Sequence, residues 1–122
     1  MMTQAEYEEA LVERLTMLKE ETDVEFVYEL VEIYMAESPK MISSIRDAIL
    51  KKDFEALRTT AHTLKGSSYN LGAKRLGDLC FALETAGRAK EQFPPLESID
   101  ELQKELNNLQ ILFDAFKKKQ SL

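Results

Sequence analysis

Apolar residues recur every three or four positions along most of the chain, which is the spacing of amphipathic helices. We predict a first helix over about 3–18 and a second that begins at Thr22 or Asp23, either of which is a suitable N-cap. The second helix either restarts at Ser38-Pro39, with Ser38 as its N-cap, or continues there with a kink. The expected inward side chains of these two helices are Tyr7, Ala10, Leu11, Leu15, Leu18, Phe26, Val27, Leu30, Val31, Tyr34, Met35, Met41, Ile42, Ile45, Ala48 and Ile49.

Three further helices follow from the same spacing. One is predicted over about 54–69 with Asp53 as its N-cap, and a second over about 73–88 after a turn at Gly72. Tandem prolines after Phe93 then separate a last helix over about 96–118. The inward positions of the three are Phe54, Leu57, Ala61, Leu64, Ser68, Leu76, Leu79, Cys80, Leu83, Ala86, Ile99, Leu102, Leu106, Leu109, Phe113 and Phe116.

Short connections between amphipathic helices favour antiparallel neighbours. We therefore expect an all-α fold, an antiparallel up-down four-helix bundle over about 23–118 with an additional N-terminal helix. A chain of 122 residues is long enough for one core, so residues 1–122 are expected to form a single domain.

Composition narrows the class of protein. A net charge of −6 argues against non-specific nucleic-acid binding, and without a run of 18 apolar residues no membrane-spanning helix is expected. The polar, acidic N-terminus does not look like a secretory signal, and the single cysteine, Cys80, suits a reducing cytoplasm. Nothing in the sequence indicates dimerisation, so we expect a cytoplasmic monomer.

The charge is unevenly distributed around the only histidine, His62. Residues 56–77 contain no acidic side chain and carry four cations, namely Arg58, Lys65, Lys74 and Arg75. Such a local basic patch in an acidic protein suggests an anionic group or partner at that place. The plainer alternative is a chance fluctuation along a solvated helix face.

The neighbours of His62 point to phosphoryl chemistry on its imidazole. At about 100° per residue, His62 lies roughly 120° from the centre of the apolar stripe and should project from the side of the bundle. Lys65 at i+3 would place an ammonium near the ring, where it could neutralise phosphoryl oxygens. Gly66 at i+4 costs about 1 kcal/mol of helix stability relative to alanine, and it would leave open space beside the ring.

Each of these residues also has a less specific explanation. Lys65 alone could be a solvated helix lysine, and Gly66 alone could serve close helix packing. Neither explanation accounts for both residues flanking the sole histidine. Arg58 at i−4 and Tyr69 at i+7 lie on the same side of the helix, so they are candidates for contact with a partner.

The run His62-Thr63-Leu64-Lys65-Gly66-Ser67-Ser68, followed by Leu71-Gly72-Ala73, closely resembles the signature of histidine-containing phosphotransfer (HPt) domains. The segments 53–57 and 79–84 resemble the flanking helices of that family, and the likeness extends from about Asp23 to Phe116. The resemblance implies that His62 is the phosphorylated residue, Lys65 its cationic neighbour and Gly66 the small residue that opens the site.

The same resemblance implies a function and its partners. Members of the family accept a phosphoryl group from a phospho-aspartate on a response-regulator receiver domain and pass it, reversibly, to another receiver aspartate. A hybrid sensor kinase and receiver domains are thus the expected partners, with Mg²⁺ in the receiver only and no cofactor in this chain. No glycine-rich ATP-binding loop occurs in the sequence, so we expect a carrier without kinase activity of its own.

Two other classes of function remain open on the sequence. A helical adaptor bundle could bind a signalling partner without chemistry, although it would leave the arrangement of His62, Lys65 and Gly66 unexplained. An enzyme with a carboxylate metal site inside the bundle would need Glu-x-x-His pairs, and the single histidine has Thr59 three residues before it. We therefore expect no metal site.

Overall fold

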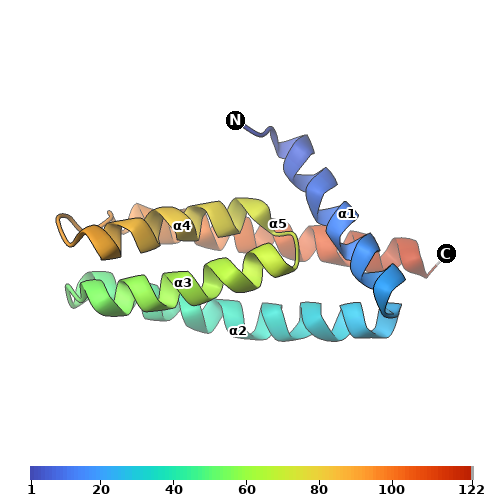
Figure 1. The fold of residues 1–122 in the computed structure, drawn as a ribbon, viewed down its shortest axis with the longest axis horizontal. Coiled ribbons are helices and arrows are strands. Elements are labelled where there is room, and N and C mark those ends of the chain that lie inside the picture. The colour runs from blue at the N-terminus through green and yellow to red at the C-terminus, as the bar shows by residue number, and fades with distance from the viewer. Residues whose placement is uncertain (122) are drawn as a thin grey trace.

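The computed structural model describes residues 1–121, which form five helices and no strand. The helices are α1 (Gln4–Glu21), α2 (Val24–Leu50), α3 (Phe54–Asn70), α4 (Lys74–Ala89) and α5 (Glu97–Gln120). Helices α2 to α5 form an antiparallel up-down bundle, and α1 crosses obliquely near one end of it (Figure 1). The expected all-α architecture with an additional N-terminal helix is confirmed, and the expected domain end at Leu122 lies outside the described residues.

Side-chain caps explain where three of the helices begin. Thr3 and Glu6 form a reciprocal capping box at the start of α1. The Asp23 carboxylate accepts from the backbone N–H of Phe26, and Asp53 caps α3 in the same way. Asp23 is thus the N-cap of α2, while α1 continues three residues beyond the predicted end.

The second helix is continuous through Pro39, so the alternative in which it restarts there is wrong. Ser38 is not an N-cap, because it is buried inside the helix and its Oγ donates to the Tyr34 carbonyl oxygen at 2.6 Å. Phe26 is also not inward as expected, because its side chain is exposed. The adjacent Val27, which is expected to be inward as well, is fully buried.

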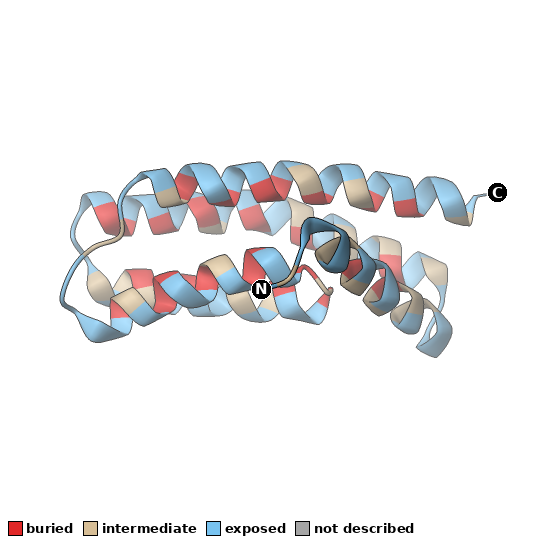
Figure 2. Cartoon of the chain, turned by 90° about the horizontal axis from the view of Figure 1, so that it is seen from above, coloured by how far each residue is buried: buried red, intermediate tan, exposed pale blue. Residues whose placement is uncertain are grey.

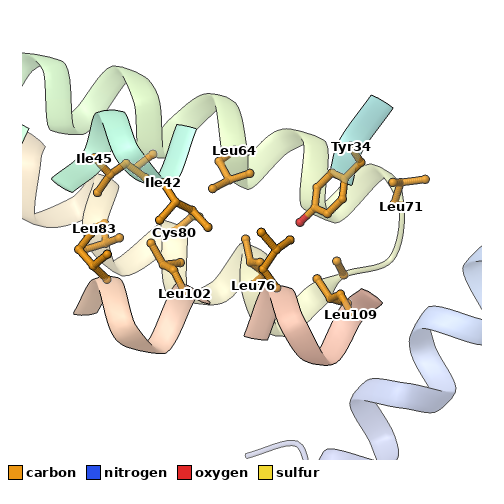
Figure 3. Close-up of a cluster of buried hydrophobic side chains, with 14 of the residues drawn as sticks. Tyr34, Ile42, Ile45, Leu64, Leu71, Leu76, Cys80, Leu83, Leu102 and Leu109 are labelled. Atoms are coloured by element: carbon orange, nitrogen blue, oxygen red, sulfur yellow. The ribbon is translucent and has the colours of Figure 1, made fainter. Parts of the chain in front are cut away.

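One apolar core runs between the four bundle helices (Figure 2). Leucine and isoleucine side chains from α2, α3, α4 and α5 meet there, together with Cys80, which is fully buried (Figure 3). Burial raises the pKa of the Cys80 thiol to about 12, so this cysteine behaves as a small apolar residue. The Tyr34 hydroxyl, also buried, forms a 2.7 Å hydrogen bond with the Ser68 hydroxyl and thereby ties α2 to α3.

The α3–α4 hairpin, whose outer surface carries the candidate site, is closed by a tight turn. Gly72 adopts a φ of +82°, which L-residues rarely tolerate. A Cβ at this position would also lie 2.5 Å from the Cβ of Arg14 on α1. The predicted turn at Gly72 is therefore confirmed, and the glycine also lets α1 approach the hairpin closely.

Candidate functional site

His62 lies in the middle of α3 with its side chain 62% exposed, as the helical spacing predicts. The opposite face of the helix is anchored by Leu57, Ala61 and Leu64, all fully buried. The imidazole is nevertheless fixed, because its Nδ1 lies 2.6 Å from Oε2 of Glu84 on α4. An exposed ring is thus held at one nitrogen by a neighbouring helix.

Glu84 is the centre of the site, although it is a charged residue that is only 3% exposed at its side chain. Its Oε1 accepts from Lys65 Nζ at 2.6 Å. Its Oε2 accepts from Arg88 at 3.2 Å and contacts His62 Nδ1. Two cations and an imidazole therefore surround one buried carboxylate, which satisfies the requirement that a buried charge be paired.

These contacts determine which nitrogen of His62 carries the proton. The hydrogen bond from Lys65, above all, lowers the pKa of Glu84 despite the opposing effect of burial, so the carboxyl group is ionised at neutral pH. An ionised carboxylate can only accept, and Nδ1 must therefore be the donor. A neutral imidazole protonated at Nδ1 has its free lone pair at Nε2, which makes Nε2 the nucleophilic atom.

Lys65 and Gly66 lie beside the ring, where the sequence places them. Lys65 is largely buried, with its ammonium on Glu84 and 5.2 Å from the centre of the Phe81 ring, so it is not a freely solvated lysine. A Cβ built on Gly66 would meet no atom within 4 Å. Close helix packing is thus wrong as the reason for this glycine, and open space next to the ring is what it provides.

The two candidate contact residues are placed differently. Arg58 is half-buried one turn before His62, where it forms an ion pair with Glu55 of its own helix. The Tyr69 hydroxyl donates to Asp78 Oδ1 at 2.7 Å, and its ring lies so close to Gly77 that any side chain there would collide. Tyr69 is only 37% exposed, so much of its surface is used in packing α3 against α4.

The structure does not gather all four cations of the basic segment at His62. Lys65 is part of the site and Arg58 lies one turn away. Arg75 instead faces Glu105 on α5 and the Tyr7 ring on α1. The basic segment in the sequence is therefore not one basic patch in space.

Glu84 and Arg88 are the site residues that the sequence reasoning did not single out. The available signal was that Glu84 follows Leu76 and Cys80 at helical spacing, which places a carboxylate on the inward side of α4. A charged residue at such a position requires a partner. The identity of that partner depends on how α3 and α4 pair, which local spacing does not reveal.

An apolar groove of about 450 Å³ lies between α1, α2 and α3, next to the C-terminal half of α3. Leu18, Leu30, Ile33 and Met41 are among its lining residues, and Ser67 and Asn70 connect it to the helix that carries His62. Ile33 is 61% exposed, which is unusual for an isoleucine unless the surface has a partner.

The described part of the chain contains neither a membrane-spanning helix nor a cluster of potential metal ligands. None of the helices in residues 1–121 is both long and apolar enough to cross a membrane. Over the same residues, no three His, Cys, Asp or Glu side chains come together as a potential metal site. The carboxylate at the candidate site is occupied by cationic side chains of the protein itself.

Comparison with known proteins identifies the fold and family. The HptB phosphotransfer protein of Pseudomonas aeruginosa PAO1 has a similar crystal structure, with a TM-score of 0.76 and 28% sequence identity over 89% of this chain and 91% of that one. Histidine-containing phosphotransfer protein 1 of rice, Oryza sativa subsp. japonica, is 26% identical over 84% of this chain and 71% of its own length.

Pseudo histidine-containing phosphotransfer protein 6 of Arabidopsis thaliana is 27% identical over 79% of this chain, and the matched region spans 64% of that relative. The family model described as Hpt domain matches residues 29–111, a segment that includes His62, Lys65, Gly66 and Glu84. The chain therefore belongs to the Hpt domain family.

Proposed function

We propose that this protein is a phosphorelay intermediate in which His62 accepts a phosphoryl group from a receiver-domain phospho-aspartate and passes it to another receiver aspartate. The observation that carries the proposal is an exposed imidazole whose Nδ1 is fixed by the ionised Glu84, which leaves Nε2 as the nucleophile. Lys65 supplies a positive charge beside this ring, and Gly66 leaves room for an approaching active site.

A non-catalytic adaptor is the alternative, and family membership alone does not decide against it. One of the relatives is itself named a pseudo histidine-containing phosphotransfer protein. Only this chain's own residues distinguish the two functions. Burying the charged Glu84 in α4 costs desolvation free energy. An adaptor has no need for such a residue aimed at an exposed histidine on α3.

The geometry supports a direct displacement at phosphorus. The Nε2 lone pair attacks the phosphoryl group of the aspartyl phosphate, the bond from phosphorus to the aspartate oxygen breaks, and its electron pair returns to the aspartate. Negative charge on the phosphoryl oxygens would be stabilised by Lys65, whose ammonium retains donors beyond the one on Glu84. The receiver would supply the Mg²⁺ and the carboxylate, so this chain would act as a carrier without ATP binding or kinase activity.

We assign receiver docking to the groove between α1, α2 and α3. Its lining is mainly apolar, it adjoins the helix that carries His62, and it exposes Ile33. An apolar surface of the receiver seated there would bring its aspartate towards His62 and Gly66. The hybrid sensor kinase would present its own receiver domain to the same groove. We expect the protein to act as a monomer in the cytoplasm.

Transfer of label from a radioactive phospho-receiver domain in the presence of Mg²⁺ tests the proposed function. The wild-type protein should acquire an acid-labile, base-stable label, as expected of phosphohistidine, whereas His62→Ala should acquire none because the nucleophile is gone.

Thr63→Ala is the matched control, because Thr63 is the exposed neighbour of His62 and its hydroxyl only bonds back to Thr59 of the same helix. This variant should be labelled like the wild type. Absence of label on the wild type across a broad panel of receivers would favour the adaptor. Equal labelling of His62→Ala would show that a different residue is phosphorylated.

A further inference from the structure

The contact between Glu84 and His62 has consequences for the phosphorylated protein as well as for the free one. Glu84 accepts the Nδ1 proton and is kept ionised by Lys65 and Arg88. None of these contacts involves Nε2, so phosphorylation at Nε2 leaves the hydrogen bond to Glu84 in place. The inference that follows rests on the proposed function of His62.

We propose that Glu84 is a positioning residue that keeps a proton on Nδ1 of His62 throughout phosphoryl transfer, so that the phosphorylated ring is a cation and a good leaving group. A neutral phosphohistidine would release an imidazolide anion, which is a poor leaving group. A ring protonated at Nδ1 instead releases neutral imidazole. A buried carboxylate 2.6 Å from Nδ1 stabilises the protonated ring by direct charge pairing.

With this proton held in place, the ring passes through the whole cycle without gaining or losing a proton. On the way in, Nε2 forms its bond to phosphorus, the phosphorus–oxygen bond to the donor aspartate breaks, and the ring becomes a cation with Nδ1–H still on Glu84. On the way out, an acceptor carboxylate attacks phosphorus, the bond to Nε2 breaks, and its electron pair returns to Nε2. The ring is then again the neutral tautomer from which it started.

The charges facing the ring are compatible with this state. Glu84 contacts the ring from α4, and Lys65 and Arg88 both pair with Glu84. Arg58 lies one turn before His62 on α3. Arg58 is neutralised by Glu55, so Glu84, Lys65 and Arg88 together carry a net charge of +1 in the free protein. The phosphoryl group adds about two negative charges. A cationic ring then brings the cluster close to neutrality, whereas a neutral ring would leave it negative.

The tautomer of the free protein gives a test that needs no variant. Nitrogen-15 NMR of the histidine side chain distinguishes Nδ1–H from Nε2–H, and the chain has a single histidine to observe. At a pH where the ring is uncharged, the wild-type signal should be that of Nδ1–H. A spectrum dominated by Nε2–H would overturn the proposal.

The phosphorylated protein gives the second test. Phosphoramidate, a small phosphoryl donor, can label His62 without any receiver, and NMR then follows protonation of the phosphorylated ring against pH. In Glu84→Gln the titration midpoint should fall by about one pH unit or more, because the amide accepts a hydrogen bond but carries no charge. Hydrolysis of the label at neutral pH should slow in parallel.

Glu105→Gln is the matched control, because Glu105 is a second buried glutamate whose partners, Asn108 and Arg75, belong to a different cluster. Its midpoint should equal that of the wild type. Equal midpoints in the wild type and Glu84→Gln would overturn the proposal even if receivers transfer phosphate normally. A lowered midpoint in Glu84→Gln, without transfer from any receiver, would instead support the role of Glu84 and reject the relay function.

Discussion

At the scale of single residues, Gly66 shows most directly how this site departs from what is best for the fold. Its position in α3 is open. A helix with glycine in its interior is less stable than one with most other residues at the same position. We expect Gly66→Gln to raise the free energy of unfolding by up to about 1 kcal/mol, measured by urea denaturation. The same variant should slow phosphoryl transfer from a receiver at least roughly 10-fold, because the new side chain occupies the approach to His62.

Gly77→Ala provides the contrast within the same hairpin. A Cβ at Gly77 would lie 2.3 Å from the Tyr69 ring, so this substitution should lower stability. An unchanged transfer rate in Gly66→Gln would remove the steric role of that glycine.

The two buried glutamates should respond to pH in opposite directions. The pKa of Glu84 lies below its ordinary value in the native protein because Lys65 donates to it, so its ionised form stabilises the fold and this contribution is lost as pH falls through the native pKa. Burial raises the pKa of Glu105, so ionisation of this carboxyl group destabilises the native state. This destabilisation is lost as the group is protonated on acidification.

We therefore expect Glu84→Gln to be less stable than the wild type at neutral pH, with the difference shrinking as the pH falls. Glu105→Gln should be at least as stable as the wild type at neutral pH and lose that advantage on acidification. Urea denaturation at a series of pH values measures both differences. Parallel behaviour of the two variants would contradict the assignment of opposite pKa shifts.

Sequence reasoning found the residues of the site that lie on one helix and missed those on the other. His62, Lys65 and Gly66 are related by i+3 and i+4 spacing, so helical periodicity alone places them together. Glu84 is 22 positions away from His62, and it reaches the ring only because α3 and α4 pair in a particular register. Arg88 joins the site through Glu84, which lies one turn before it on α4. That register depends on packing of the whole hairpin, including the close approach at Gly77.

At the scale of the elements, α2 is the helix whose form was left open by its sequence. Proline at position 39 removes one backbone donor, yet the helix continues, with Ser38 buried and bonded to the Tyr34 carbonyl oxygen. The tertiary contacts of Ile42 and Ile45 on one side and Val27 and Tyr34 on the other hold both halves to the same core. Packing along the bundle thus outweighs the local preference of proline to end a helix.

We expect Pro39→Ala to stabilise the protein by about 2 kcal/mol, because alanine restores the missing hydrogen bond and suits a helix interior. The gain is smaller than the full helix propensity difference, since alanine also gives the unfolded chain more freedom. Urea denaturation measures the change, with Lys40→Ala as control because Lys40 is exposed and forms only a surface ion pair with Glu37. A loss of stability in Pro39→Ala would mean that the proline itself is needed for the path of α2.

At the scale of the whole molecule, the chemistry and the proposed docking surface belong to different sets of helices. The cluster around His62 is built by α3 and α4, whereas the groove is built by α1, α2 and α3. Helix α1 is fixed against the bundle by Leu11 and Leu15 in the core and by Arg14 Nε, which donates to the Asn70 carbonyl oxygen at 2.9 Å. A substitution in the groove should therefore affect recognition without altering the reactivity of the histidine.

Ile33→Glu tests this separation, because it places a charge in the apolar groove at an exposed position where the fold has little to lose. Transfer from a phospho-receiver should fall roughly 10-fold or more, since an unpaired charge would have to be buried on docking. Phosphorylation by phosphoramidate, which needs no docking, should remain at the wild-type rate. Ile111→Glu is the matched control: Ile111 is equally exposed but lies on α5, which contributes nothing to the groove. If both isoleucine variants slowed receiver transfer equally, the effect would be one of overall charge, and the groove would lose its role as the docking surface.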